Sequence, residues 1–326
     1  MRIGFFGEVM REHRADGRGY GFGGDTLNTA LYLHRLSTQH RLNIEVQYFT
    51  LLGQDAASNQ LAATLAEEGL ALRAGRHPAK TLGQYWIDID AAGERSFRYQ
   101  RDDSAVRQYF AAEQTSLKQT PLEQALVNGS LDALYLSGIS VAILPEPDRQ
   151  RLYQAAADFV GRGGWLIYDN NFRPLLWQAE AAARWQQKLL PLCQLALLTD
   201  SDERLIWQLP DAGPAATPAA LVDAALHAGA YTVLLKCGAA PCWIGTAALR
   251  LQVEAQQVRQ LVDSSGAGDA FAAGFLGRFL TAPDALVAAD LVAAAQAGHQ
   301  LAAAVVQQHG AIIPRELMPQ ISLQGA

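Results

Sequence analysis

One short stretch near the C-terminal end, VDSSGAGDAF at residues 262–271, joins flexible glycines to a single carboxylate. Gly266 and Gly268 allow a tight turn and the close approach of a ligand to main-chain N–H groups. We expect a helix to begin near Asp269, and the unpaired N–H groups of its first turn would attract an anion. A carboxylate at that point would compete with a phosphate for the N–H groups unless it has a task of its own. The task that fits is to accept a proton from a hydroxyl while the N–H groups stabilise the transferring phosphoryl group. The alternative is a simple helix cap after a loop, because short glycine motifs are weak signals.

A second glycine-rich turn, GFGGDTLNTA at residues 21–30, also precedes a predicted helix. Asp25 is a candidate cap for that helix. Asn28 follows three residues later, so we expect both side chains on one face of the first turn. Two polar groups on one helix face suit a polyol with adjacent hydroxyls. The presence of both clusters favours phosphoryl transfer over the helix-cap alternative.

The rest of the chain alternates short apolar runs with longer amphipathic ones. This rhythm predicts an α/β fold with a mostly parallel sheet that is covered on both faces, and such sheets bind ligands at the carboxyl ends of their strands. We expect strands at 2–7, 46–53, 132–138, 165–170, 195–199 and 231–238. We expect helices near 25–36, 56–68, 146–161, 176–190, 217–229, 269–280 and 284–308.

One segment, QYWIDIDAAGERSFRYQR at 84–101, alternates with period two around DAAGER and predicts a β-hairpin outside the main sheet. Its first strand places Tyr85, Ile87 and Ile89 on one face, and its second strand places Phe97, Tyr99 and Arg101 on one face. We interpret the hairpin as a small lid, with the glycine-rich segment 17–24 beside it. The predicted organisation is one α/β domain over 1–326 with an inserted β-lid at approximately 10–22 and 80–105.

The composition limits the classes of partner. The chain has 326 residues, half of them hydrophobic, so a sizeable core can form. Its 26 basic and 32 acidic residues give a net charge of −6, which argues against nucleic acid as a partner. An anionic ligand would therefore be held by local groups rather than by the field of the whole protein.

The expected location is the cytoplasm. The three cysteines form no CxxC pair and are predicted to be free thiols in a reducing compartment. The N-terminal apolar run reaches Glu8 too early for a signal peptide. The alanine-rich stretch 284–308 is interrupted by Asp290 and His299, so we expect no membrane span.

Together, GGDTLNTA and DSSGAGDAFAAG resemble the two signatures of the ribokinase-like (phosphofructokinase-B type) sugar kinases. DNNFRPLLW at 169–177 resembles the family's D-x-N-x-R segment, and TDSDE at 199–203 lies where the family has N-x-x-E. The resemblance covers nearly the whole chain and is greatest to the 2-keto-3-deoxygluconate kinase branch. It implies a three-layer sandwich and ATP-dependent phosphorylation of the 6-hydroxyl of 2-keto-3-deoxygluconate, which would give 2-keto-3-deoxy-6-phosphogluconate.

The resemblance also implies roles for individual residues. Asp269 matches the catalytic base, and Gly266, Ala267 and Gly268 match the anion hole. Substrate-binding positions are matched by Gly24, Asp25, Asn28, Tyr85, Tyr99, Arg101 and Arg173. Nucleotide-binding positions are matched by Lys236, Gly238, Gly266, Gly268 and His299. Glu203 matches a position that holds Mg²⁺ through water. Asp200 stands beside it where the family more often has asparagine, a change that adds a negative charge and keeps an oxygen ligand for the metal. A monovalent cation activates some relatives.

Several of these residues have a plain structural alternative. Tyr85 and Tyr99 could only pack the lid, and Arg101 could be a solvated residue of a hairpin edge. Arg173 could serve phosphate charge instead of the substrate carboxylate. Glu203 and Asp200 could simply begin a helix, and His299 could be a packed core residue.

The sequence departs from the branch at two places. Arg11 stands where an aliphatic residue is usual, and Arg11 and His13 could either add positive charge near the substrate mouth or be solvated. Pro241 and Cys242 replace a glycine often found in the turn after Gly238, which puts that nucleotide contact in doubt.

The alternatives in function are a neutral-sugar kinase such as a fructokinase, or a sugar-sensing protein that has lost activity. The intact GAGD with Asp269 argues against the sensor, and Arg101 beside Tyr99 argues against a neutral sugar. Preference between the gluconate and galactonate epimers stays open. An exposed lid edge invites pairing between subunits, so we expect a homodimer formed through the lid.

Overall fold

The structure, a computed structural model, describes residues 1–13, 19–89, 95–111, 119–210, 213–281 and 287–323, and the side chains of 87–97 lie outside this description. Its centre is a nine-stranded sheet in the order β13-β12-β11-β10-β9-β8-β1-β4-β5. Neighbouring strands are parallel except for β12 and β13, which continue the sheet antiparallel from β11. The strands are β1 (Arg2–Phe6), β4 (Glu45–Leu52), β5 (Ala71–Arg76), β8 (Ala133–Ser137), β9 (Trp165–Asp169), β10 (Cys193–Thr199), β11 (Val233–Lys236), β12 (Cys242–Gly245) and β13 (Arg250–Val253).

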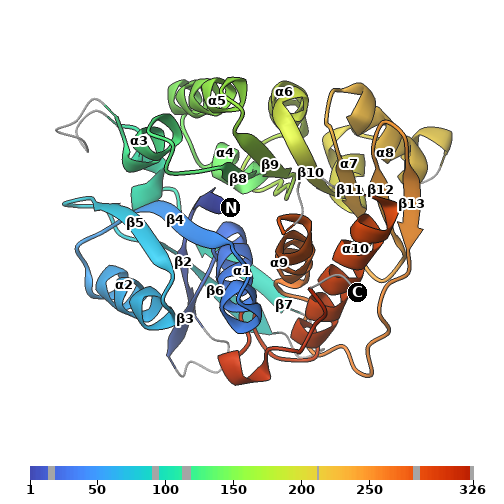
Figure 1. The fold of residues 1–326 in the computed structure, drawn as a ribbon. Coiled ribbons are helices and arrows are strands. Elements are labelled where there is room, and N and C mark those ends of the chain that lie inside the picture. The colour runs from blue at the N-terminus through green and yellow to red at the C-terminus, as the bar shows by residue number, and fades with distance from the viewer. Residues whose placement is uncertain (14–18, 90–94, 112–118, 211–212, 282–286, 324–326) are drawn as a thin grey trace.

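Helices cover both faces of this sheet, which confirms the predicted layered α/β fold (Figure 1). One face carries α1 (Asp25–His40), α2 (Ala56–Glu68), α9 (Ala267–Phe279) and α10 (Ala288–Val305). The other carries α3 (Pro121–Val127), α4 (Gly138–Ala142), α5 (Glu146–Gly161), α6 (Ala179–Leu189), α7 (Asp200–Ile206) and α8 (Pro218–His227). Each face has its own apolar core, since side chains of a strand alternate between the two sides. Among the described residues, no helix combines the length and apolar character that a membrane span requires.

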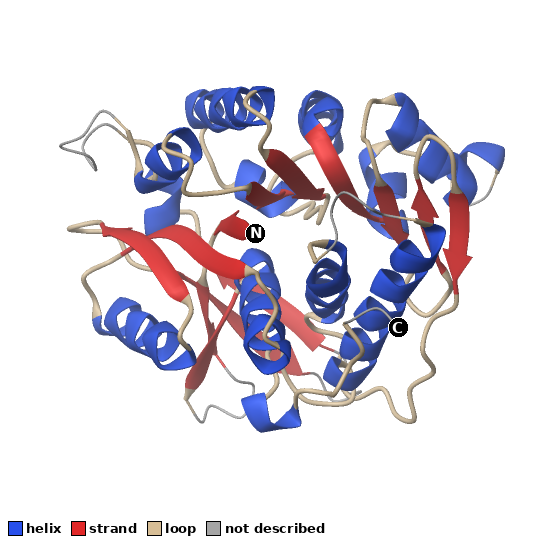
Figure 2. Cartoon of the chain, viewed as in Figure 1, coloured by secondary structure: helices blue, strands red, loops and turns tan. Residues whose placement is uncertain are grey.

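A second, smaller sheet has four strands in the order β3-β2-β6-β7 and lies apart from the main sheet (Figure 2). It contains β2 (Met10–His13), β3 (Tyr20–Gly23), β6 (Gly83–Ile89) and β7 (Arg95–Gln100). The predicted hairpin is therefore confirmed, and its register pairs Tyr85 with Tyr99, so these residues share one face. The turn at 90–94 lies outside the described residues. We refer to these four strands as the lid sheet.

Most of the predicted elements are confirmed with small shifts at their ends, and two helix starts differ in a way that affects the site. α9 begins at Ala267, with Gly266 as its N-cap, so Asp269 lies inside the first turn rather than at the start. α1 begins at Asp25, with Gly24 as its N-cap and no side-chain capping bond. The prediction that Asp25 caps α1 was therefore wrong, and its carboxylate is left for other contacts.

Candidate active site

A cavity of about 900 Å³ lies between the lid sheet and the main body, where α1 and α9 begin. The segments after β9 and β10 and the end of β11 also contribute to its wall, which places it at the carboxyl ends of parallel strands. Both glycine-rich turns reach this one cavity. The residues predicted from the sequence that line it are Gly24, Asp25, Asn28, Tyr85, Tyr99, Arg101, Arg173, Lys236, Gly266, Ala267, Gly268 and Asp269.

The loop before α9 is fixed tightly against the C-terminal segment. Gly266 has φ of 71°, and a Cβ at this position would lie 2.6 Å from the carbonyl oxygen of Ala311, so only glycine fits without strain. The buried carboxylate of Asp263 accepts hydrogen bonds from the N–H of Ser265 at 3.0 Å and of Gly310 at 2.8 Å. The N–H of Ala267 donates to the carbonyl of Ser264 at 3.3 Å. The N-terminal end of α9 is thus held at the cavity wall, where its positive dipole would stabilise an anion.

Asp269 lies in this first turn and faces the other glycine-rich motif. The side-chain amide of Asn28 donates to its Oδ2 at 2.8 Å. Burial and the nearby charge of Asp25 raise the pKa of Asp269 to about 7, against the opposing effect of the Asn28 hydrogen bond. A carboxylate with a pKa near neutrality is well suited to take a proton from a hydroxyl.

Asp25 contributes a second carboxylate to the same wall, beside the first turn of α1. Its Oδ2 accepts a hydrogen bond from the side-chain amide of Asn171 at 2.9 Å. Burial raises the pKa of Asp25, and the hydrogen bonds that it accepts oppose this rise. Asp25 and Asn28 both line the cavity, which agrees with the prediction that they share one face of the helix.

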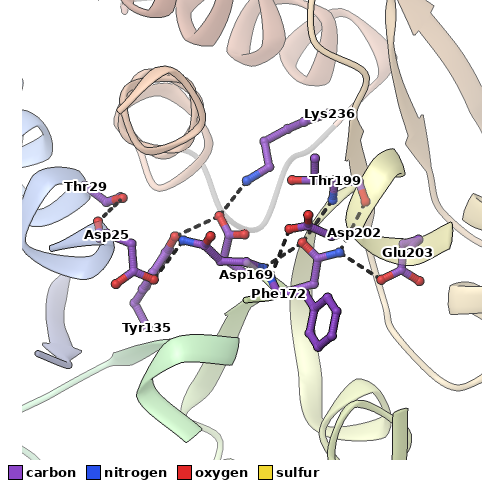
Figure 3. Close-up of polar contacts among 11 residues, drawn as sticks. Asp25, Thr29, Tyr135, Asp169, Phe172, Thr199, Asp202, Glu203 and Lys236 are labelled. Atoms are coloured by element: carbon purple, nitrogen blue, oxygen red, sulfur yellow. Dashed lines mark hydrogen bonds and ion pairs between the residues drawn. The ribbon is translucent and has the colours of Figure 1, made fainter. Parts of the chain in front are cut away.

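Lys236, at the end of β11, extends towards the middle of this group (Figure 3). Its Nζ lies 2.6 Å from Oδ2 of Asp169, which also accepts a hydrogen bond from Tyr135 at 3.1 Å. The same Nζ lies 3.7 Å from the position that a Cβ on Gly268 would take, so the ammonium is next to the N-terminal end of α9. Lys236 therefore adds a positive charge beside the first turn of α9.

The opposite wall is supplied by the lid sheet. Arg101 is buried and forms an ion pair with Glu8, donating from Nη2 to Oε2. Tyr85 donates its hydroxyl to Oε2 of Glu12, and its ring lies 5.7 Å from that of Tyr99. Arg101, Tyr85 and Tyr99 are thus brought to one surface of the cavity, as predicted from the hairpin.

The segment after β9 adds an arginine to the cavity wall, and α7, which follows β10, adds an acid. Arg173 is exposed at the cavity and donates from Nη1 to the carbonyl of its neighbour Phe172 at 2.9 Å. Asp202, in α7, lines the same region and accepts a hydrogen bond from the N–H of Phe172 at 2.9 Å. Figure 3 shows Asp202 between Asp169 and Glu203.

Two of the predicted residues, Glu203 and Asp200, are not among those that line the cavity. Glu203 is only 2% exposed, and its carboxylate accepts hydrogen bonds from Asn170, Gln186 and Trp207 at 2.7 to 3.0 Å. Asp200 forms an ion pair with Arg204 at 3.0 Å, one turn further along α7. Of the three acids in the TDSDE segment, Asp202 is the one that lines the cavity.

The other two predicted residues outside the cavity lining are Gly238 and His299. Gly238 is in a turn beyond β11 with φ of 61°. His299, in α10, is buried, and its ring packs edge-on against Phe271 with 4.8 Å between ring centres. The packing alternative for His299 thus has direct structural support.

The interpretation that Arg11 and His13 add charge at the substrate mouth is not supported, because neither lines the cavity. Arg11 stacks over the ring of Tyr20 at 3.7 Å, and His13 stacks on Trp86 at 4.6 Å. These residues alternate along β2 with Met10, which does line the cavity, so they belong to the opposite face of the lid sheet.

Sequence reasoning missed several residues that complete the site. Asp263 lies inside the DSSGAGDAFAAG motif, and Asp169 and Asn171 lie inside the D-x-N-x-R segment. Both motifs were used to predict other residues of the site, so the presence of these three residues in them was a usable signal. Asp202 lies inside TDSDE, but that pattern does not show which of its acids reaches the cavity. Glu8 gave no comparable signal, because its role depends on a contact with a residue distant in the sequence.

The comparisons with known proteins agree with this geometry. A family model described as pfkB family carbohydrate kinase matches residues 5–317. The 2-dehydro-3-deoxygluconokinase of Dickeya dadantii is 36% identical over 97% of this chain and 98% of its own length. A fructokinase of Vibrio alginolyticus is 26% identical over 78% of this chain and 75% of its own.

A solved structure, a fructokinase from Xylella fastidiosa with bound ATP, superposes with a TM-score of 0.78 over 98% of this chain and 95% of that chain, at 22% identity. This likeness shows that the two chains share a fold. The family match and the relatives' match over nearly the full length make the protein a phosphotransferase with an alcohol group as acceptor. The chain belongs to the pfkB family of carbohydrate kinases.

Proposed function

We propose that the protein transfers the terminal phosphoryl group of ATP to the 6-hydroxyl of 2-keto-3-deoxygluconate, which is the compound also called 2-dehydro-3-deoxygluconate. The observation that carries this proposal is the arrangement of the cavity. A base and an anion-binding helix end form one wall, and a buried arginine with two tyrosines forms the other. The first wall suits phosphoryl transfer to a hydroxyl, and the second suits an acidic substrate.

In the proposed reaction, ionised Asp269 accepts the proton of the 6-hydroxyl as the substrate oxygen forms a bond to the terminal phosphorus of ATP. The bond from that phosphorus to the bridging oxygen breaks, and ADP leaves. Asn28 orients the carboxylate by its hydrogen bond of 2.8 Å. The first-turn N–H groups of α9 and the ammonium of Lys236 stabilise negative charge on the transferring group.

The acid group of the substrate is assigned to Arg101 and Arg173. Guanidinium groups present several N–H donors in one plane, which matches the geometry of a carboxylate. Arg101 lies on the same lid surface as Tyr85 and Tyr99, and Arg173 approaches the cavity from the segment after β9. A sugar acid would therefore contact both the lid and the main body, and its binding would favour exclusion of water.

ATP requires a divalent cation, and Mg²⁺ is the expected one. Mg²⁺ prefers oxygen ligands and usually keeps several waters when it binds with substrate phosphates. Asp202 is the acid of α7 that lines the cavity, and Oδ1 of Asp169 is buried without a hydrogen-bond partner among the described residues. These carboxylates fit such a cation, which would neutralise charge on the phosphates when bound.

A neutral-sugar kinase such as a fructokinase is the second candidate. It would use the same base and anion-binding turn, and the fructokinase relative supports that possibility. The higher identity and coverage of the 2-dehydro-3-deoxygluconokinase relative favours the sugar acid. The arginine on the lid favours it independently, because a neutral sugar offers no carboxylate to match it.

The test is ATP turnover with Mg²⁺, followed as ADP release. The substrates are 2-keto-3-deoxygluconate, its galactonate epimer, fructose, ribose and a blank without sugar. We expect turnover on the keto-deoxy acid that falls by at least about 10³-fold in Asp269→Asn, which keeps the shape of the side chain but cannot accept the proton. Turnover on fructose alone would refute the substrate assignment and retain the mechanism. Binding without turnover on any sugar would support the sensor alternative.

We further propose a homodimer formed through the lid sheet, in the cytoplasm. On the face away from the cavity, Trp86 is stacked between His13 at 4.6 Å and the guanidinium of Arg98 at 4.3 Å, so aromatic surface is concentrated there. The cytoplasmic assignment is supported by three free cysteines. Light scattering after gel filtration tests the dimer, and Trp86→Glu is expected to yield monomers. A monomeric wild-type protein would refute it.

A further inference from the structure

The ion pair between Glu8 and Arg101 lies at the base of the lid sheet. Glu8 comes just after β1, where the chain leaves the main sheet for the lid. Arg101 comes just after β7, where the chain returns. The return is itself fixed, because the N–H of Ser104 donates to the carbonyl of Arg101 at 3.2 Å and Ser104 forms a β-bridge with Thr81. The pair therefore connects two of the points at which the lid sheet joins the body, one before β2 and one after β7.

Both partners are buried, but only one of them lines the cavity. The side chains are 1% exposed for Glu8 and 8% exposed for Arg101, and Arg101 is the member that contributes to the cavity wall. Glu8 thus contacts the guanidinium from behind. A Cβ on Gly83 would lie 2.8 Å from Oε1 of Glu8 and 3.2 Å from Cβ of Arg101, so the lid strand β6 leaves room for the pair by having no side chain there.

The hydrogen bonds of the pair are incomplete. Nη2 of Arg101 donates to Oε2 of Glu8, whereas Nε of Arg101 and Oε1 of Glu8 are buried without a partner among the described residues. A guanidinium has five N–H donors, and its contact with Glu8 leaves others for a second acceptor. A buried arginine that loses its carboxylate partner is unstable in place and would turn towards another acceptor or solvent.

We propose that Glu8 is a positioning residue for substrate specificity: it holds the guanidinium of Arg101 from behind, so that the remaining N–H donors meet the carboxylate of the sugar acid. This inference deepens the proposed function and rests on it. A ligand-binding side chain is effective only when its own orientation is fixed by surrounding contacts. In this site the fixing contact comes from Glu8, just after β1, far from the hairpin in the sequence.

The experiment compares two substrates that differ in charge but little in shape: 2-keto-3-deoxygluconate and its primary amide. The measured quantity is the ratio of kcat/KM for the acid to that for the amide. This ratio does not depend on the fraction of folded enzyme, so a partly unstable variant still gives a valid result. The variants are Glu8→Gln, Arg101→Gln and the double variant, with Glu8→Asp as a second substitution that retains charge but shortens the side chain.

We expect Arg101→Gln to lower the ratio by about 100-fold and Glu8→Gln by about 10-fold, on the scale set for charge-assisted hydrogen bonds. KM for the acid should carry the change, with kcat within about threefold of wild type. In the double variant the ratio should equal that of Arg101→Gln alone, because Glu8 acts only through Arg101. Glu8→Asp should also lower the ratio, since it displaces the guanidinium.

Three results would overturn the positioning role. Multiplying effects in the double variant would show that Glu8 acts independently of Arg101. An unchanged ratio in Glu8→Gln and Glu8→Asp would show that the pair is only structural. A lower KM for the acid in Glu8→Gln would show that Glu8 competes with the substrate for the guanidinium. If the wild-type enzyme does not turn over the acid, the proposed function itself fails, which is a separate outcome.

Discussion

The hydrogen bond from Asn28 to Asp269 makes a quantitative prediction about pH. Because Asp269 must be ionised to accept a proton, kcat/KM for the sugar acid should rise with pH through its pKa of about 7. The Asn28 amide donates to Oδ2 at 2.8 Å and so favours the ionised form. Asn28→Ala removes this donor, and the pKa of Asp269 should therefore rise.

The expected size follows from the type of bond. A hydrogen bond to a charged group contributes about 1.5–3 kcal/mol, and one pKa unit corresponds to about 1.4 kcal/mol. The pKa of Asp269 in Asn28→Ala should thus lie about 1–2 units above that of the wild type. At pH 7 the variant would hold most of its Asp269 in the protonated form, and its activity should recover on raising the pH.

The matched control is Asp25→Asn, for which the opposite shift is expected. The charge of Asp25 raises the pKa of Asp269, so its removal should move the rising limb of the profile to lower pH. The assay is kcat/KM for the sugar acid between pH 5 and 9.5 with saturating Mg²⁺ and ATP. If Asn28→Ala leaves the limb unchanged or moves it downwards, the titrating group is not Asp269 and the reasoning is refuted.

Three further predictions concern stability and metal use. Asp269→Asn should stabilise the fold by up to about 4 kcal/mol above pH 7, because the raised pKa of Asp269 makes the stability of the wild type fall as pH rises from about 4 to 7. Equal melting temperatures of the two proteins at pH 8 would contradict this prediction. Gly266→Ala should lower the free energy of unfolding by about 2 kcal/mol or more and abolish turnover, since position 266 combines φ of 71° with a 2.6 Å approach to Ala311. Denaturant unfolding measures the loss of stability, and a fully active, stable variant would show that the turn tolerates a side chain. Glu203→Gln should destabilise the folded protein by about 2–4 kcal/mol, because the new amide N–H₂ would face the N–H₂ donors of Asn170 and Gln186. A stable variant that only needs more Mg²⁺ for activity would instead support a metal-binding role for Glu203.

The fold was largely predictable because the central strands are buried on both faces and read as continuous apolar runs. LALLT and ALYLS are such runs, and both lie near the middle of the sheet. The strands that were missed lie at the ends of the sheet. β5 reads ALRAGR and β13 reads RLQV, and both are only partly buried, so neither has the apolar run that identifies a central strand. β12 reads CWIG, and its apolar run is too short to be identified as a strand from the sequence.

Site residues were predictable where a motif fixes the position of the backbone. They were not predictable where the rotation of a helix, or a contact between residues distant in the sequence, determines which side chain reaches the cavity. The glycine-rich turns located Asp25 and Asp269 because the anion-binding geometry is local. In TDSDE, three acids occupy the first turn of α7, and only the packing of that helix determines that Asp202 reaches the cavity while Glu203 is buried under Trp207. Short-range patterns carry no information about that rotation.

The charges of the cavity explain why a cation and a helix end are both needed for the proposed reaction. Two cationic residues of the lining, Lys236 and Arg101, are already paired with the buried carboxylates of Asp169 and Glu8. The chain as a whole carries −6, so its overall field does not attract ATP or a sugar acid. Two anionic substrates can therefore share the cavity only if part of their negative charge is neutralised by positive groups that are not already paired with a carboxylate of the protein. Mg²⁺ on the phosphates and the N-terminal end of α9 are such groups, and the exposed Arg173 is a third.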